Sequence, residues 1–265
     1  MILDLIYDHP IWLSGAVVIA LAVFISWIGL AIAARIWPHD IRVNHNDVAG
    51  FIIAIVGVVY AVLLAFIAVA VWQNYDAVNS AVDREASLIS NLYRDAIALP
   101  EPARSALRAD LDQYLTTVIE IEWPVQRAGH AKKRGWRPLN HFHAELAKAE
   151  TDKPHGGIVL AEMLRALNNL YDARRTRLLS GQGGLNGFIW TILLIGGAIT
   201  IAFSYFFGVR SLRVHFAMTG MLAASLALVF VLMIALDKPF RGSLGIEPTP
   251  YIDVQKELRH LPAGD

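Results

Sequence analysis

The chain has 265 residues, of which 55% are hydrophobic, and its mean hydropathy is +0.46, which argues against an ordinary soluble enzyme. The 23 basic and 23 acidic residues cancel, so no net positive field points to nucleic acid as a partner. There is no cysteine, which excludes disulfides, thiol catalysis and cysteine-bound metal centres.

Two apolar runs near the start are each long enough to cross a bilayer, which takes roughly 20 helical residues. The first spans about residues 11–36. A signal peptide would carry positive charge before its apolar run, but no Lys or Arg precedes this one, so we expect a retained transmembrane helix. The second spans about residues 48–72. The short polar link between the two runs predicts an antiparallel hairpin over residues 1–72.

The second run carries two further patterns. Small residues recur every three or four positions, which is typical of a face on which membrane helices pack closely. These helix-packing candidates are Gly50, Ala54, Gly57, Ala61 and Ala65. Bulky apolar residues fall on other faces, namely Phe51, Ile55, Val62, Phe66 and Val69. Two interpretations stay open: a helix packed inside a bundle, or a helix at the axis of an oligomer whose bulky side chains form a pore constriction.

Polar groups at and within this run are candidates for a pore entrance. Asn46 and Asp47 stand at the N-cap position, and Tyr60 lies inside the span. The free N–H groups of a helix N-terminus favour an anion, whereas the charge of Asp47 opposes it.

Residues 73–184 are polar and amphipathic, which predicts a helical extramembrane domain. Its first helix continues the second span without a break to about residue 99. Further helices are expected over about 102–124, 141–150 and 157–179. The basic loop from Lys132 to Arg137 is interpreted either as a solvated loop or as a contact for anionic lipid head groups.

Two more apolar runs, about residues 185–208 and 214–236, form a second hairpin, and a polar tail follows at 237–265. The predicted fold class is therefore an all-α integral membrane protein with four transmembrane helices in two hairpins flanking a helical extramembrane domain. An even number of spans places both termini and the domain on one side. The domain side carries six basic residues near the membrane: Arg84, Arg174, Arg175, Arg177, Lys238 and Arg241. The opposite side carries Arg35, Arg42, Arg210 and Arg213, so the positive-inside rule favours a cytoplasmic domain.

No motif points to catalysis. Four histidines lie close together in the sequence: His130, His141, His143 and His155. Because His141 and His143 are two positions apart, they would point to different faces of a helix, and we expect no metal site. No carboxylate or basic side chain lies deep in a span, which argues against a proton relay. We expect neither an enzyme nor a bound cofactor.

Several segments resemble one family of bacterial and plant membrane proteins. The segments are Asn46-Asp47-x-Ala49-Gly50-Phe51, Val71-Trp72-x-x-Tyr75, Arg84-Glu85-Ala86 and, near the end, Leu236-Asp237-Lys238-Pro239-Phe240-Arg241-Gly242. They are similar to the family usually labelled bestrophin-like (DUF4239). The resemblance implies pentameric anion channels with four spans per subunit, a cytosolic helical domain and a second span that lines the pore with a hydrophobic neck. It also marks Asp237, Pro239, Phe240 and Arg241 as a structural motif. No acidic cluster near Lys238 matches the calcium site of bestrophins, so calcium gating is not expected.

These observations predict a homo-oligomeric ion channel in a bacterial inner membrane, with the lipid bilayer and a permeant ion, chloride or another small anion, as partners. The alternative is a membrane-anchored scaffold or sensor whose helical domain binds a partner. A small-solute transporter is disfavoured, because the sequence shows neither broken helices nor deep charges.

Overall fold

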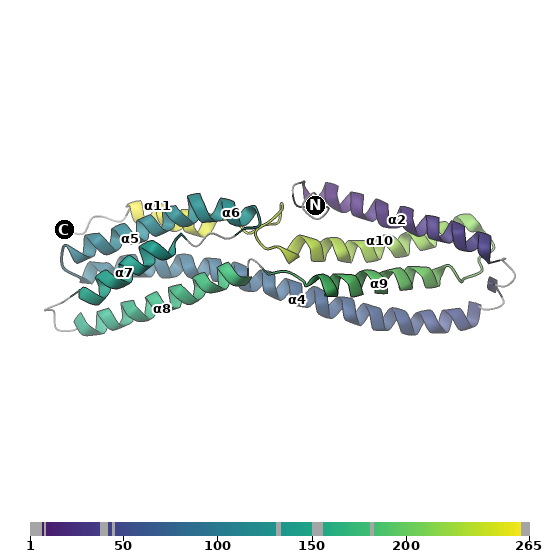
Figure 1. Cartoon of the computed structure of the whole chain (residues 1–265), viewed down its shortest axis with the longest axis horizontal. Coiled ribbons are helices and arrows are strands. Elements are labelled where there is room, and N and C mark those ends of the chain that lie inside the picture. The colour runs from purple at the N-terminus through teal and green to yellow at the C-terminus, as the bar shows by residue number, and fades with distance from the viewer. Residues whose placement is uncertain are drawn as a thin grey trace. The chain divides into compact units, whose positions relative to one another are not determined.

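The computed structural model describes residues 7, 9–37, 42–43, 46–130, 134–149, 156–180 and 183–260. Within these ranges every regular element is a helix (Figure 1). The chain divides into two compact units. We call Met1–Gln73 together with Gly184–Asp237 the membrane unit, and Asn74–Gly183 together with Lys238–Asp265 the helical unit.

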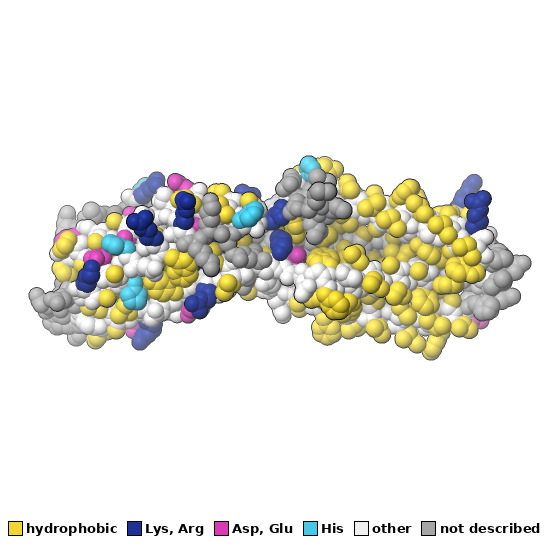
Figure 2. Space-filling model, in the orientation of Figure 1, with side chains coloured by type: hydrophobic (Ala, Val, Ile, Leu, Met, Phe, Trp, Pro, Cys, Tyr) yellow, Lys and Arg dark blue, Asp and Glu magenta, His cyan; other side chains and the backbone are white. Residues whose placement is uncertain are grey.

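Among the described residues, four helices are long and apolar enough to cross a membrane: α2 (Ile11–Ile36), α4 (Asn46–Asp95), α9 (Gly187–Ser204) and α10 (Leu212–Asp237). Hydrophobic side chains cover most of the visible face of the membrane unit, whereas charged side chains are spread over the helical unit (Figure 2). The predicted fold class is thus confirmed, and the chain is a multi-pass membrane protein.

α10 is the most enclosed of the four spans, and α2 packs closely along it. At Gly220 a side chain would overlap the indole of Trp27, 2.9 Å away. The Trp27 N–H donates a hydrogen bond to the carbonyl oxygen of Phe216, at 2.9 Å. A glycine in α10 therefore lets α2 place a ring against the neighbouring backbone, the close approach that stabilises helix pairs in lipid.

The helical unit contains the second half of α4, then η1 (Ala96–Ala98), α5 (Ala103–Thr117), η2 (Val118–Glu122), α6 (Trp123–Arg127), α7 (Trp136–Lys148), α8 (Gly156–Ser180) and α11 (Thr249–His260). Side chains from α4, α5, α7, α8 and α11 share its core. The continuous helix from span to domain was predicted, and α4 ends four residues before the expected position.

Three boundaries differ from the predictions. The helix expected to end near residue 124 continues through one π-helical turn into α6, because Pro124 occupies a first-turn position where no amide donor is needed. The short helix expected near His141 begins at Trp136. The tail predicted only as polar contains α11, whose Tyr251, Val254 and Leu258 are buried at helical spacing.

Candidate pore-lining helix

One face of α4 is buried along its whole length. In the membrane unit this face holds Ala49, Tyr60, Leu64 and Val71, and in the helical unit it holds Val78, Val82 and Ile89. At about 100° per residue these positions fall on one stripe of the helix. Within the membrane unit, Tyr60 and Leu64 pack against Leu193 of α9 and Met233 of α10.

The five predicted constriction residues lie on the opposite face. Phe51, Ile55, Val62, Phe66 and Val69 fall within an arc of about 60°, and all are exposed. The two phenylalanines are the most exposed of the set, at 71% for Phe51 and 73% for Phe66. The structure thus brings these five together as a single apolar stripe that no other part of the described chain covers. We call it the exposed α4 stripe.

The small-residue stripe lies along one edge of the exposed α4 stripe. Ala54, Ala61 and Ala65 are exposed, and a side chain at Gly57 would meet no atom within 4 Å. A side chain at Gly50 would only touch Phe207, at 3.9 Å. The close approach inside the chain occurs elsewhere, where Tyr60 lies against Gly196 and Gly197 of α9. A packing role for the small-residue stripe therefore stays a prediction for contacts with another copy.

The three predicted entrance residues separate. The Tyr60 hydroxyl donates to the carbonyl oxygen of Leu193 at 2.7 Å on the buried face of α4, so Tyr60 does not share a face with the constriction candidates. The side-chain amide of Asn46 donates to the Gly208 carbonyl oxygen at 3.1 Å and its oxygen accepts from the Gly208 N–H at 2.8 Å. Both residues therefore hold helices together, and only Asp47 is exposed at the start of α4.

The exposed face changes character beyond the span. In the same helical register as Phe66 and Val69, α4 carries Gln73, Asp76 and Ser80, which are all exposed. One helix face is therefore apolar over the membrane-spanning part and polar directly after it.

A buried ion network holds the other side of α4 in the helical unit, and the sequence analysis did not predict it. Its members Glu85, Glu122, Arg174 and Arg177 are each 0% exposed. Arg177 binds Glu85 through Nε at 2.8 Å and Glu122 through Nη2 at 3.2 Å. Arg174 binds both oxygens of Glu122, at 2.7 and 2.9 Å. Two carboxylates thus balance two guanidinium groups.

Uncharged neighbours complete the network. The Gly135 N–H donates to Glu122 at 2.7 Å, Arg177 donates to the Gln126 side-chain oxygen at 2.7 Å, and the Tyr114 hydroxyl donates to Glu85. Burial alone would raise the pKa of Glu122, but the hydrogen bonds from Arg174 and the charges of Arg174 and Arg177 outweigh it and hold that pKa below its ordinary value. The Glu122 carboxylate is therefore expected to stay ionised inside the core.

A signal for this network was present in the sequence. Glu85 lies seven residues after Val78 and four before Ile89, which puts it in the apolar register of α4. Arg174 and Arg177 follow Leu167 and Leu170 at the same helical spacing. Charged residues in a core register indicate buried partners, because a lone buried charge costs too much. Arg174 and Arg177 therefore do not act as membrane-flanking charges. Arg42 on the opposite side is buried as well, so four such residues remain on the domain side and three on the other.

The motif near the end of the chain forms a turn at the start of the helical unit's last segment. The Asp237 carboxylate, at the end of α10, accepts a hydrogen bond from the Leu185 N–H at 2.6 Å and so fixes the start of the α9 segment. Phe240 is buried edge-on against Trp123, with centroids 5.2 Å apart. The Pro239 carbonyl oxygen accepts from the Ile246 N–H at 2.8 Å.

The remainder of this motif fits around Arg241. Its side chain passes close to Gly129, where a Cβ would lie 3.4 Å from the Arg241 Cδ. Lys238 donates to the carbonyl oxygen of Gly183 at 3.0 Å.

The histidines singled out in the sequence lie in different contacts. His141 Nδ1 lies 2.7 Å from a carboxylate oxygen of Asp110, and His143 stacks on Tyr171. Among the described residues no group of three His, Cys, Asp or Glu side chains is placed to hold a metal. His155, with Lys132 and Lys133 of the basic loop, lies outside the described ranges.

The fold and the α4 face define a helical membrane protein with four candidate spans and one long helix shared by both units. A family model of the bestrophin-like domain matches residues 20–251, and the chain belongs to this family. A comparison with curated proteins returns no match.

Solved structures agree on the fold. A mutant form of a bacterial bestrophin homologue from Klebsiella pneumoniae is similar with a TM-score of 0.71 and 12% identity, over 93% of this chain and 99% of that chain. A second mutant form gives 0.70 and 12%, over 91% and 97%. A structure of the same homologue phased with zinc gives 0.67 and 13%, over 91% and 97%. At this identity the likeness concerns the fold.

Proposed function

We propose that the chain is one subunit of a homo-oligomeric ion channel in which the exposed α4 stripe lines the pore. Membership of the bestrophin-like family supports an oligomeric ion channel in general. The observation that carries the pore assignment is the division of α4 into a face buried in its own subunit and an opposite apolar face that the described part of the chain leaves exposed. A stripe of this size needs either lipid or another copy of the chain to cover it.

A ring of copies accounts for both patterns on this helix. With the exposed α4 stripe turned to the axis, Phe51, Ile55, Val62, Phe66 and Val69 form an apolar constriction that closes by dewetting. The small-residue stripe then lies at the flank, where an adjacent copy can approach closely. The polar residues Gln73 and Asp76 lie on the same helix face, directly beyond the constriction.

The charge at the end of the membrane unit where α4 begins supports a small anion such as chloride as the permeant ion. α2 ends and α4 begins there, and the α9–α10 connection lies beside them, as the bonds of Asn46 to Gly208 show. Among the described residues the exposed charges at this end are Arg35, Arg210 and Arg213 against Asp47. A net positive entrance raises the local concentration of anions.

We further propose a bacterial inner membrane with both termini and the helical unit in the cytoplasm. Flanking charges give little guidance on the orientation, since Arg174 and Arg177 on one side and Arg42 on the other are buried. Support comes from the resemblance to bestrophins, whose helical domain is cytosolic. Because the chain has no cysteine, single cysteines at Ser87 and Arg213 can be tested with a membrane-impermeant maleimide in intact cells. Labelling of Arg213→Cys alone is expected, and labelling of Ser87→Cys alone would reverse the assignment.

The alternative of a scaffold finds less support. A scaffold would need an uncovered apolar stripe on the helical unit to bind its partner. The large apolar side chains exposed there among the described residues form no stripe on one helix; they are Ile97, Ile158, Leu179 and Leu244.

The test of the channel is the conductance of the full chain reconstituted in planar bilayers. Phe66→Ala removes the most exposed ring of the α4 stripe and is expected to raise the conductance several-fold, because the constriction becomes wider and less apolar. Phe188→Ala is the matched control, since Phe188 is 70% exposed on α9, away from that stripe, and should conduct like the wild type. Equal conductance of Phe66→Ala and wild type would refute the assignment of this face.

A further inference from the structure

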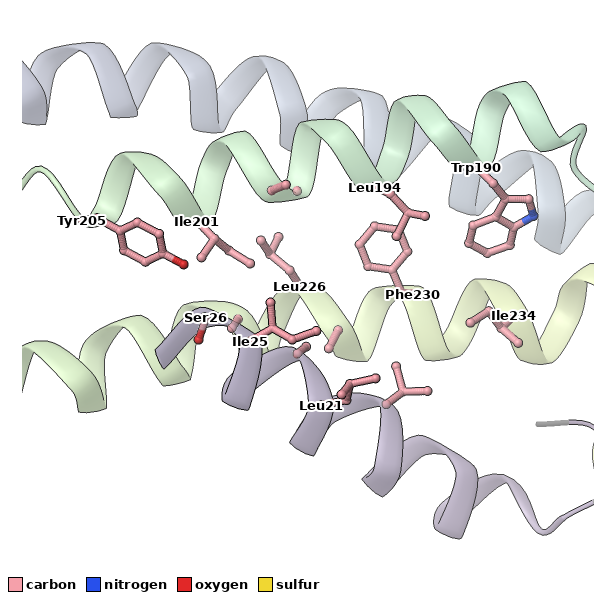
Figure 3. Close-up of a pocket in the computed structure, with 16 residues that line it drawn as sticks. Leu21, Ile25, Ser26, Trp190, Leu194, Ile201, Tyr205, Leu226, Phe230 and Ile234 are labelled. Atoms are coloured by element: carbon pink, nitrogen blue, oxygen red, sulfur yellow. The ribbon is translucent and has the colours of Figure 1, made fainter. Parts of the chain in front are cut away.

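The membrane unit contains an open cavity of about 520 Å³ between α2, α9 and α10 (Figure 3). Along α9 its lining runs from Trp190 at one end to Tyr205 at the other. Phe230 and Leu226 of α10 and Leu21 of α2 close its other sides. No α4 residue contributes to the lining, so this groove is separate from the proposed pore face.

The lining offers almost nothing to water. Its residues are apolar apart from the hydroxyls of Ser26 and Tyr205 and the indole of Trp190. Ser26 donates its hydroxyl hydrogen to the carbonyl oxygen of Val23 at 2.7 Å, within its own helix. A water molecule needs two or more polar partners, and cavities lined by apolar groups stay dry. An empty groove forfeits dispersion contacts along its whole lining, so the natural occupant is hydrocarbon.

The dimensions decide which hydrocarbon fits. From Trp190 to Tyr205 the helix rises about 22 Å. Spread over that length, the volume of about 520 Å³ gives a cross-section of about 24 Å², or a width of about 5 Å. A helix with its side chains is at least about 10 Å wide and cannot enter. Methylene groups pack at separations of about 4 Å, so a single unbranched chain fills this width.

We propose that the groove between α2, α9 and α10 binds an acyl chain of a membrane lipid. Tyr205 and Trp190 mark the two ends of a membrane span, where aromatic side chains sit at the interfaces. The groove is longer than one leaflet, which is about 15 Å of hydrocarbon, so it continues past the bilayer midplane. The site is independent of ion conduction and does not rest on the proposed channel.

The first experiment fills the groove. Ala198 is an exposed lining residue of α9, and Ala31 is an exposed residue of α2 outside the groove. The full chain, purified in detergent with phosphatidylethanolamine and phosphatidylglycerol, is analysed by native mass spectrometry. Wild type and Ala31→Phe are expected to retain bound phospholipid, and Ala198→Phe to lose most of it. Equal retention by all three would overturn the proposal. If the wild type holds no lipid and Ala198→Phe forms an assembly with fewer subunits than the wild type, the proposal is overturned and the groove is assigned to a second copy of the chain instead.

A second measurement leaves the groove open. Since the chain has no cysteine, Ala198→Cys and Ala31→Cys can each carry one bimane label. Quenching by a phosphatidylcholine with a spin-labelled acyl chain, titrated in detergent, is expected to saturate for the Ala198→Cys label and to rise linearly for the Ala31→Cys label. A linear response at both positions would contradict a defined acyl-chain site.

Discussion

In the helical unit two carboxylates and two guanidinium groups lie in the core, whereas the spans of the membrane unit satisfy their polar side chains on backbone carbonyls. Tyr60 donates to Leu193, Trp27 to Phe216 and Thr200 to Gly196, each across or along a helix. The surfaces differ in the opposite sense, apolar in one unit and charged in the other (Figure 2). A protein core surrounded by water can hold charges as a closed set, while in lipid an uncharged donor and a carbonyl suffice.

α4 belongs to both environments and keeps one buried face through them. On that face Tyr60 occupies the register that Glu85 occupies further along. Tyr60 donates one hydrogen bond to a backbone carbonyl oxygen, whereas Glu85 is one of four charged groups in the buried ion network. Perturbing the two positions therefore measures how differently the two units depend on a polar group in the same helix register.

The largest effect is expected for Glu85→Gln. It removes one charge from the network, and breaking a buried ion pair costs about 3–5 kcal/mol because the partner is left unpaired. Since Arg177 also contacts Glu122, we expect about 3 kcal/mol. Thermal and chemical unfolding of the purified full chain, followed by circular dichroism, measures this loss. Asp83→Asn, exposed on the same helix, is the control and should change stability by less than about 0.5 kcal/mol. A Glu85→Gln variant as stable as the control would contradict the role of the network.

A smaller effect is expected for Tyr60→Phe. The variant keeps the ring against Gly196 and Gly197 and loses only the hydrogen bond to Leu193. Hydrogen bonds between membrane helices contribute about 0.6 kcal/mol on average, so stability should fall by about that amount. Conductance should stay at the wild-type level, because Tyr60 faces its own subunit. A large change in ion selectivity would instead return Tyr60 to the pore entrance.

The smallest effect concerns pH. The hydrogen bond to Asp110, together with its charge, raises the pKa of His141 above its ordinary value. A folded-state pKa above the unfolded value of about 6.5 stabilises the fold fully below about pH 6.5, and this contribution disappears as pH rises through the folded pKa. The melting-temperature difference between wild type and His141→Asn should therefore be larger at about pH 5.5 than at about pH 9. His143→Asn, whose ring stacks on Tyr171, serves as the control. A difference that grows with pH would reverse the sign and refute the pairing.

The spans and the continuity of α4 were predictable because their apolar runs and helical registers are long. The same periodicity grouped Phe51, Ile55, Val62, Phe66 and Val69, and the structure places them on one exposed face. The hydrogen bonds of Asn46 to Gly208 and of Tyr60 to Leu193 could not be predicted, because a sequence shows which residues are polar but not which backbone group each one meets. The buried ion network was missed because Glu85, Arg174 and Arg177 were each considered separately. Their shared positions in the apolar registers of their helices indicate that they are buried together. The groove depends on the spacing of α2, α9 and α10, which no local pattern encodes.

The central claim is that copies of this chain surround an axis with the exposed α4 stripe turned inward. Single-particle imaging of the purified full chain tests it most directly. The account predicts a closed ring with a continuous axial path whose narrowest apolar section is lined by residues between Phe51 and Val69. A monomer, or a dimer without an axial path, would contradict it.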